Sequence, residues 1–403
     1  MTQFSSGAAE NLKEAKLPRR DWILLPLVGV LTICFIAVCV ELIARRVFSE
    51  SAKTLASCFV MNDPLTGVRG IPNSVCREKG PETQWIESRF NSCGYLAGME
   101  CGPKQPGHYR IVMTGSSVAV GEHVQREQTF AALLPEELSR QTGHTIELYN
   151  ESMGFGFSHS TALRFNDVLT AQPDMILWIL TPMDIEGGQL GLPSRAIANW
   201  NNQSLAAKAW FRIKTSFNSG SMSDAVSQVF GRTRTSLLLR HYLYESQSQY
   251  VKAYLMESPE ITDFLRAEPS PTWKMRLQKF ADDAADMEAR AKAAGVPFVA
   301  VYIPNRAQTA MISMGHWQEG FDPYRLDNDL RSIITSHGGT YLEILPDFRN
   351  IPNPEQYYLP VDGHPNISGH ALLSKLLAKA LTSGPTPALS VAAQPKAAPE
   401  QKR

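Results

Sequence analysis

The chain has 403 residues, of which 43% are hydrophobic and 19% are charged. Its 39 Lys and Arg residues balance its 39 Asp and Glu residues, so the formal net charge is zero. This composition supplies enough apolar side chains for a large core. It argues against a disordered chain and against a nucleic-acid-binding chain, because no basic cluster dominates.

The N-terminal region predicts a membrane span. No charged residue occurs from Trp22 to Val40, a run long enough to cross a bilayer as a helix, so we expect a transmembrane helix over 22–44. A cleaved signal peptide is the alternative, but the apolar run exceeds a usual signal core and Ile-Ala-Arg-Arg at 43–46 is a poor cleavage site. Flanking charges favour a cytoplasmic segment over 1–21, and hence a single-pass protein of the inner (cytoplasmic) membrane whose main domain is periplasmic; the basic residues on either side are Lys13, Lys16, Arg19, Arg20, Arg45 and Arg46.

Four of the six cysteines fall between the predicted span and the predicted catalytic domain. The other two, Cys34 and Cys39, lie in the span. Residues 47–108 are rich in Pro, Gly and Asn with little periodicity, which predicts an irregular, disulfide-tied cap or linker. Two disulfides are expected in such an exported segment, and pairing of neighbours is one of three connectivities. A zinc site is the alternative, but no Cys-x-x-Cys pair or flanking histidine supports it; the cysteines concerned are Cys58, Cys76, Cys93 and Cys101.

Strand and helix patterns alternate over residues 109–382. This rhythm predicts an α/β domain with a three-layer, doubly wound parallel sheet. A Ser-, Gln- and Asn-rich insertion at 186–272 interrupts this alternation and contains amphipathic pieces. It is interpreted as a lid, a partner-docking surface or a solvated helical face. The segment 383–403 is expected to be a disordered tail. We expect strands at 110–115, 146–150, 174–181, 296–303 and 340–345, and helices at 128–141, 159–171, 273–294, 323–336 and 366–381.

Two short motifs, far apart in the sequence, carry candidate catalytic groups. Gly115-Ser116-Ser117 ends the first predicted strand, where a hydroxyl would lie at the carboxyl edge of the sheet. Asp362-Gly363-His364 precedes the last predicted helix. A serine hydroxyl becomes a nucleophile when a histidine removes its proton and an acid orients that histidine. The alternative is a turn that merely ends a strand, with Asp362 serving as a helix cap.

These motifs resemble the first and last blocks of the SGNH (GDSL-type) hydrolase family. The resemblance implies a flavodoxin-like sheet, a Ser117 nucleophile, a His364 base and an Asp362 acid, with Ser116 in place of the family's aspartate. The final block is one residue shorter than the family's Asp-x-x-His. His370 in the last helix is expected to be structural.

The resemblance also implies an oxyanion hole. The backbone of Ser117 and that of a glycine after the second strand, Gly154 or Gly156, would contribute N–H donors. The family's third-block asparagine is missing, and Thr181 is the candidate substitute within Thr181-Pro182-Met183-Asp184. Asp184 is interpreted as a structural acid. Loss of one oxyanion donor costs about 100- to 1000-fold in turnover, so without a substitute catalysis would be weak or absent.

The function implied is that of an extracytoplasmic esterase or O-acyltransferase working through an acyl-Ser117 intermediate. Its expected substrate is an acyl ester, such as an acetyl group of an envelope glycan, and transfer would need a membrane partner that delivers the acyl donor. We expect no cofactor. A flavodoxin-like nucleotide domain shares the architecture, but no Gly-x-Gly-x-x-Gly or Gly-Lys-Ser/Thr phosphate loop is present. A non-catalytic SGNH-like module that binds glycan or a partner in envelope polysaccharide assembly is the alternative.

Overall fold

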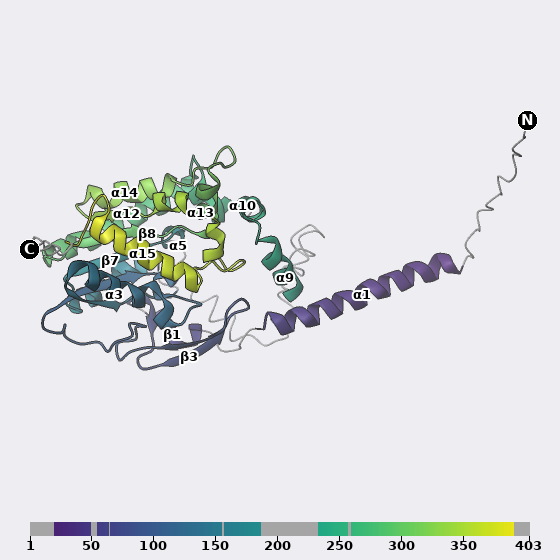
Figure 1. The fold of residues 1–403 in the computed structure, drawn as a ribbon, viewed down its shortest axis with the longest axis horizontal. Helices are drawn as coiled ribbons and strands as arrows, with labels where there is room; N and C mark the ends of the chain where they lie inside the picture. Colours follow the sequence, from purple (N-terminus) through teal and green to yellow (C-terminus); the bar gives the residue numbers. More distant parts are fainter. Residues whose placement is uncertain are drawn as a thin grey trace, which may run out of the picture.

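A long N-terminal helix projects from a compact α/β domain (Figure 1). The computed structural model describes residues 20–49, 55–63, 65–154, 157–186, 233–256 and 259–390. Helix α1 (Asp21–Val47) contains the predicted span, and none of its most apolar 18-residue window is buried. Among the helices in the described residues, α1 alone is long and apolar enough to cross a membrane. An apolar surface of this length that no protein covers is typical of a membrane segment or a signal sequence, and not of a core helix.

The domain is organised around a five-stranded, all-parallel sheet, as the sequence predicts. Its strand order is β6-β5-β7-β8-β9. The chain therefore starts at β5, adds β6 on one side and then β7 on the other, which makes the carboxyl end of β5 the topological switch point where such sheets bind ligands. The strands are β5 (His108–Gly115), β6 (Thr145–Asn150), β7 (Met175–Leu180), β8 (Phe298–Tyr302) and β9 (Thr340–Leu342).

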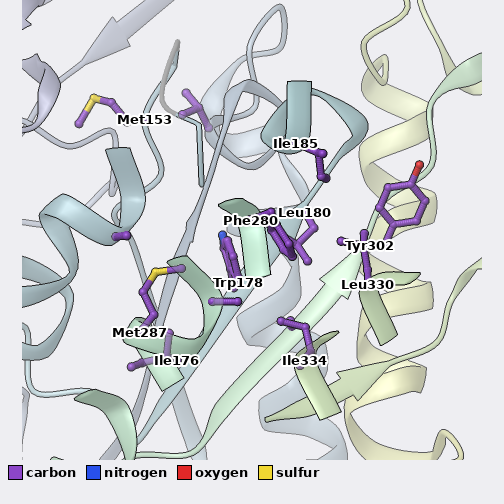
Figure 2. Close-up of a cluster of buried hydrophobic side chains, with 14 of the residues drawn as sticks. Met153, Ile176, Trp178, Leu180, Ile185, Phe280, Met287, Tyr302, Leu330 and Ile334 are labelled. Atoms are coloured by element: carbon purple, nitrogen blue, oxygen red, sulfur yellow. The ribbon is translucent and has the colours of Figure 1, made fainter. Parts of the chain in front are cut away.

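Side chains that alternate along the central strands build two separate core layers. In β7, Ile176, Trp178 and Leu180 face one layer, whereas Met175, Leu177 and Ile179 face the other, and all are fully buried. Figure 2 shows Trp178 at the centre of the first layer beside Phe280, and the two rings are stacked with centroids 5.1 Å apart. The first layer is covered by α4 (Ser158–Thr170), α12 (Pro271–Ala293) and α14 (Arg325–Ser336), and the second by α3 (Phe130–Thr142) and α15 (Ile367–Ser383).

The five predicted strands and the five predicted helices of the domain are thus present, and their ends differ from the predicted ones by a few residues. Helix α13 (Arg306–Met314) has only nine residues and was not predicted, although Ala307, Ala310, Met311 and Met314 form a short apolar stripe that packs on the core. Shorter helical segments complete the domain: α2 (Ser117–Val120), α5 (Pro182–Glu186), α10 (Gln247–Leu255), α11 (Pro259–Thr262) and the 3₁₀ turns η1 (Leu55–Cys58), η2 (Arg126–Gln128), η4 (Asp263–Leu265), η5 (Leu345–Asn350) and η6 (Pro354–Tyr357).

The cap is more regular than its sequence predicts. It contains two antiparallel hairpins, β1 (Phe59–Asp63) with β2 (Gly67–Gly70), and β3 (Val75–Lys79) with β4 (Trp85–Arg89). These strands are too short to show a clear period in the sequence, and the expectation of an irregular cap was wrong for this reason. The cysteines are joined as neighbours, Cys58 with Cys76 and Cys93 with Cys101.

Two predicted appendages are described in part. Within the 186–272 insertion, residues 187–232 lie outside the described residues, and helix α9 (Arg234–Leu243) lies beside the end of α1 (Figure 1). Of the predicted tail, 391–403 lie outside the described residues. The part from 383 to 390 is ordered, contrary to the expectation, because Leu389 is buried and the N–H groups of Ala388 and Leu389 donate to the carbonyl of Leu381 at 3.0 and 2.9 Å.

Candidate active site

The serine motif forms a tight turn at the carboxyl end of the central strand β5. Gly115 passes so close to β7 that a Cβ there would lie 2.6 Å from the carbonyl oxygen of Ile179, so a residue with a side chain does not fit. Ser116 is buried, and Ser117 begins the short helix α2. The sequence therefore places one serine of the pair in the core and presents the other at the switch point of the sheet.

Ser117, His364 and Asp362 form a continuous hydrogen-bonded chain. The Ser117 hydroxyl lies 2.8 Å from Nε2 of His364, and Nδ1 of His364 lies 2.7 Å from Oδ1 of Asp362. A nucleophile, a base and an orienting acid in this order match a serine-hydrolase triad in geometry. The structure thus brings together the three residues that the sequence motifs selected.

Gly363 explains how an acid and a histidine only two residues apart meet side by side. Its φ of +87° is in the left-handed region that glycine adopts without strain. The resulting turn lets the backbone N–H of His364 donate to Oδ1 of Asp362 at 3.1 Å, while the His364 ring contacts the same oxygen. The shorter spacing of this block is therefore compatible with triad geometry.

A second histidine, which the sequence analysis missed, faces the same acid. His123 Nε2 lies 3.4 Å from Oδ2 of Asp362, and its backbone has a φ of +70°. Burial acts to lower the pKa of His123, but the hydrogen bond and charge of Asp362, with the charges of Glu122 and Glu78, outweigh it and raise the pKa to about 9.

The two histidines together keep the acid ionised. Burial alone would raise the pKa of Asp362, but the hydrogen bonds and charges of His123 and His364 hold it well below its usual range. Ligand atoms of these three side chains lie within 4.8 Å of one another, so the cluster could hold a metal ion if their mutual hydrogen bonds broke. His123 leaves no motif in the sequence, because a lone histidine in a loop has no recognisable spacing.

Thr181 does not fit the predicted oxyanion role. Its N–H and its hydroxyl both donate to Oδ2 of buried Asp184, at 2.8 and 2.7 Å, and the Ser116 hydroxyl donates to the same oxygen at 3.1 Å. With both donors engaged, Thr181 has none left for a substrate oxygen. Burial raises the pKa of Asp184 to about 6, despite these hydrogen bonds. Asp184 thus ties the serine turn to the end of β7, a structural role.

Of the two candidate oxyanion glycines, Gly154 lies next to Glu122, and Gly156 lies outside the described residues. The loop that follows β6 is held against the serine turn, since the N–H of Met153 donates to the carbonyl of Gly115 at 3.0 Å. A Cβ at Gly154 would collide with Oε1 of Glu122, a carboxyl oxygen buried without a hydrogen-bond partner among the described residues. Burial raises the pKa of Glu122.

The triad opens into a cavity of about 430 Å³ with a mostly apolar wall. Tyr250 and Tyr254 of α10 line it, so the insertion contributes directly to the site. His370, by contrast, is fully buried: its Nδ1 accepts the N–H of Phe130 at 3.2 Å, and burial lowers its pKa to about 4. The other main apolar residues of the cavity wall are Val118, Phe157, Met183, Ile261, Ile303 and Tyr358.

Comparisons with known proteins find solved structures that align with part of this chain. No family model matches the sequence, and no curated protein matches it significantly. The solved structures include the esterase EstA from Pseudoalteromonas sp. (11% identity, 68% of this chain and 96% of that chain covered, TM-score 0.37) and the acetyl xylan esterase AlAXEase (14%, 68% and 100%, 0.37). A third is the acetylxylan esterase Axe2 from Geobacillus stearothermophilus (10%, 70% and 96%, 0.36). Because these identities and TM-scores are low, we base the function on the site of this chain alone.

Proposed function

We propose that this chain is a membrane-anchored, extracytoplasmic serine esterase or O-acyltransferase of the SGNH type. The observation that carries the proposal is the hydrogen-bonded chain from Ser117 through His364 to Asp362, at 2.8 and 2.7 Å. This arrangement activates a serine hydroxyl for attack on an ester carbonyl. Its position at the switch point of the sheet supports the same conclusion.

The reaction proceeds in two acyl transfers. His364 Nε2 accepts the Ser117 proton as Oγ bonds to the ester carbonyl carbon, and the carbonyl oxygen becomes an oxyanion. The tetrahedral species collapses, the ester C–O bond breaks, and His364 gives the proton to the leaving alcohol. Water or a second alcohol then attacks acyl-Ser117 with His364 as base, which releases either a free acid or a new ester.

The oxyanion is stabilised by backbone donors. Ser117 is the first residue of α2, where helix N–H groups have no acceptor within the helix, so its N–H is the first donor. Gly154, whose loop is held against the serine turn by the Met153 N–H bond to Gly115, is the second donor in this proposal. Thr181 supplies none, and one fewer donor lowers turnover by about 100- to 1000-fold, so we expect a slow enzyme.

The cavity is compatible with an ester substrate. Its volume of about 430 Å³ and mostly apolar wall can hold an acyl group together with part of the alcohol that carries it. The exposed apolar surface of α1 and the two disulfides support an exported domain on a membrane anchor, and hence an envelope glycan as the natural ester or acceptor. Transfer would require a membrane partner that presents the acyl donor, because a single span cannot carry a cytoplasmic thioester outward.

A non-catalytic glycan-binding module is the second candidate, favoured because the donors of Thr181 are engaged by Asp184 and do not replace the third oxyanion side chain. Incubation of the full-length protein with p-nitrophenyl acetate, with and without an oligosaccharide acceptor, separates the candidates. Acetylated oligosaccharide that is absent with Ser117→Ala would establish transfer, and free acetate alone would establish hydrolysis. Glycan binding by a folded protein that turns over no ester would favour the binding module.

A further inference from the structure

The backbone of the catalytic acid is held by a carboxylate from the cap. Glu82 lies in the turn between β3 and β4, and its side chain is only 3% exposed. It accepts the N–H of Asp362 at 2.9 Å and the N–H of Val361 at 3.1 and 3.2 Å. Hydrogen bonds from two successive backbone donors to one charged acceptor fix the direction of this loop, and with it the direction of the Asp362 side chain.

The same carboxylate is also the contact point of helix α9. His241 Nδ1 lies 2.7 Å from Oε1 of Glu82, and the His241 ring packs edge-on against Phe48, just after α1. Leu237, one turn earlier on α9, lines a second cavity of about 590 Å³ together with Glu82 and Asp362. Helix α9 therefore borders a second cavity that Asp362 and His364 also line.

Helix α9 in turn begins on the apolar helix α1. Glu41, the first charged residue after the apolar run, accepts the backbone N–H groups of Arg234 and Thr235 at 3.2 and 2.9 Å and the Thr235 hydroxyl at 2.8 Å. A carboxylate at a helix N-terminus satisfies donors that would otherwise lack an acceptor and is attracted to the helix dipole. Glu41 thus caps α9 from outside, and α9 is seated on α1.

We propose that Glu82 is a positioning residue that couples the seating of α9 on α1 to the geometry of Asp362. The contacts run without a gap from Glu41 to the start of α9, from His241 to Glu82, and from Glu82 to the Asp362 backbone. This proposal rests on the proposed function, because positioning has a consequence only if Asp362 orients His364 for Ser117. It predicts that turnover depends on how the catalytic domain is attached to its N-terminal helix.

The test uses the full-length protein in detergent micelles and measures turnover of p-nitrophenyl acetate per active site. Endpoint titration with a fluorophosphonate counts the protein molecules whose Ser117 is reactive, so misfolded molecules do not enter the calculated rate per active site. Glu82→Ala and His241→Ala are compared with His241→Asn, whose amide N–H can replace the Nδ1 donor. Glu87→Gln on the neighbouring strand β4, a partly exposed carboxylate paired with Arg77 and Arg89, is the matched control.

Glu82→Ala should lower kcat per active site about 10- to 100-fold with little change in KM, since it removes charge-assisted hydrogen bonds that orient a triad residue. His241→Ala should lower kcat less, and His241→Asn should restore most of it. Glu41→Gln should lower kcat when Glu82 is present and have no further effect in Glu82→Ala, because coupled residues are non-additive.

Three failures can be told apart. Normal titration of Ser117 with an unchanged kcat per site in Glu82→Ala would overturn the positioning role and leave the proposed function intact. Additive effects of Glu41→Gln and Glu82→Ala would overturn the coupling to α1. A folded wild type that neither turns over the ester nor titrates would overturn the proposed function, and the positioning role with it.

Discussion

His123 Nε2 lies 3.4 Å from Oδ2 of Asp362, the carboxylate oxygen that does not face Nδ1 of His364. The acid of the candidate triad is therefore held between two imidazole rings, whose centroids are 5.0 Å apart. The His364 ring contacts the nucleophile Ser117, whereas His123 comes from the loop after α2. This pairing makes the site sensitive to alkaline pH through His123.

We expect the stability contributed by His123 to disappear as the pH rises. The pKa of His123 is raised from 6.5 to about 9, so its ion pair stabilises the fold fully below about pH 6.5 and is lost as the pH rises through 9. The contribution is about 1 to 3 kcal/mol. Thermal unfolding of wild type and His123→Asn, which tolerates the positive φ, should differ most at pH 6.5 and converge above pH 9. A difference that does not change with pH would contradict the ion pair.

The two adjacent serines should behave oppositely. Ser117→Ala and His364→Ala should lower kcat for a small ester at least about 1000-fold, because each removes a group that takes part in bond making or proton transfer. Ser116→Ala should retain activity and lose about 1 kcal/mol of stability, since it deletes a hydrogen bond to buried Asp184. Steady-state kinetics and thermal melts check both. If Ser116→Ala lost activity and Ser117→Ala kept it, the assignment of the nucleophile would be reversed.

Gly154→Ala should impair catalysis by displacing Glu122. The new Cβ would collide with the Glu122 carboxyl group, which lines the substrate cavity next to His364. A displacement of about 1 Å near a reacting centre costs up to about 100-fold in rate. Gly102→Ala is the matched control, because its Cβ would meet open space. Equal kcat values for the two variants would show that Gly154 does not shape the site.

The disulfides should differ in their effect on stability. Cys58 and Cys76 are 18 residues apart and buried, whereas Cys93 and Cys101 are 8 residues apart. Loop-closure entropy predicts that the disulfide closing the longer loop stabilises the fold by about 3 kcal/mol and the other by somewhat less. The Cys58→Ser/Cys76→Ser variant should also have a lower turnover, because Cys76 lies in β3 and Glu82 lies in the turn that follows β3. Chemical unfolding of both double variants, each compared with wild type, measures the difference in stability.

Patterns that repeat along the chain made the fold predictable. The continuous apolar run of β7 and the alternation of strands with helices predicted a buried parallel sheet, and the sheet in turn predicted that Ser117 would lie at its carboxyl edge. The cap hairpins were not predictable, because their strands are too short to show a period. Contacts between distant loops, such as those of His123 and Glu82 with Asp362, depend on tertiary packing and leave no local pattern.

The error at Thr181 has the same origin. A threonine after the third strand has the right chemistry for an oxyanion donor, and only the three-dimensional position of Asp184 shows that its N–H and hydroxyl are already used. Gly363 illustrates the opposite case. A spacing that departs from the family pattern became compatible with a triad because one glycine adopts a left-handed backbone.

The most direct test of the account is to label the full-length protein with a fluorophosphonate and to identify the modified residue by peptide mass spectrometry. The 2.8 Å contact between Ser117 and His364 predicts a label on Ser117 in wild type and in Ser116→Ala, and none in Ser117→Ala or His364→Ala. A folded wild type without label on Ser117, or equal labelling of Ser117 in His364→Ala, would contradict an activated serine.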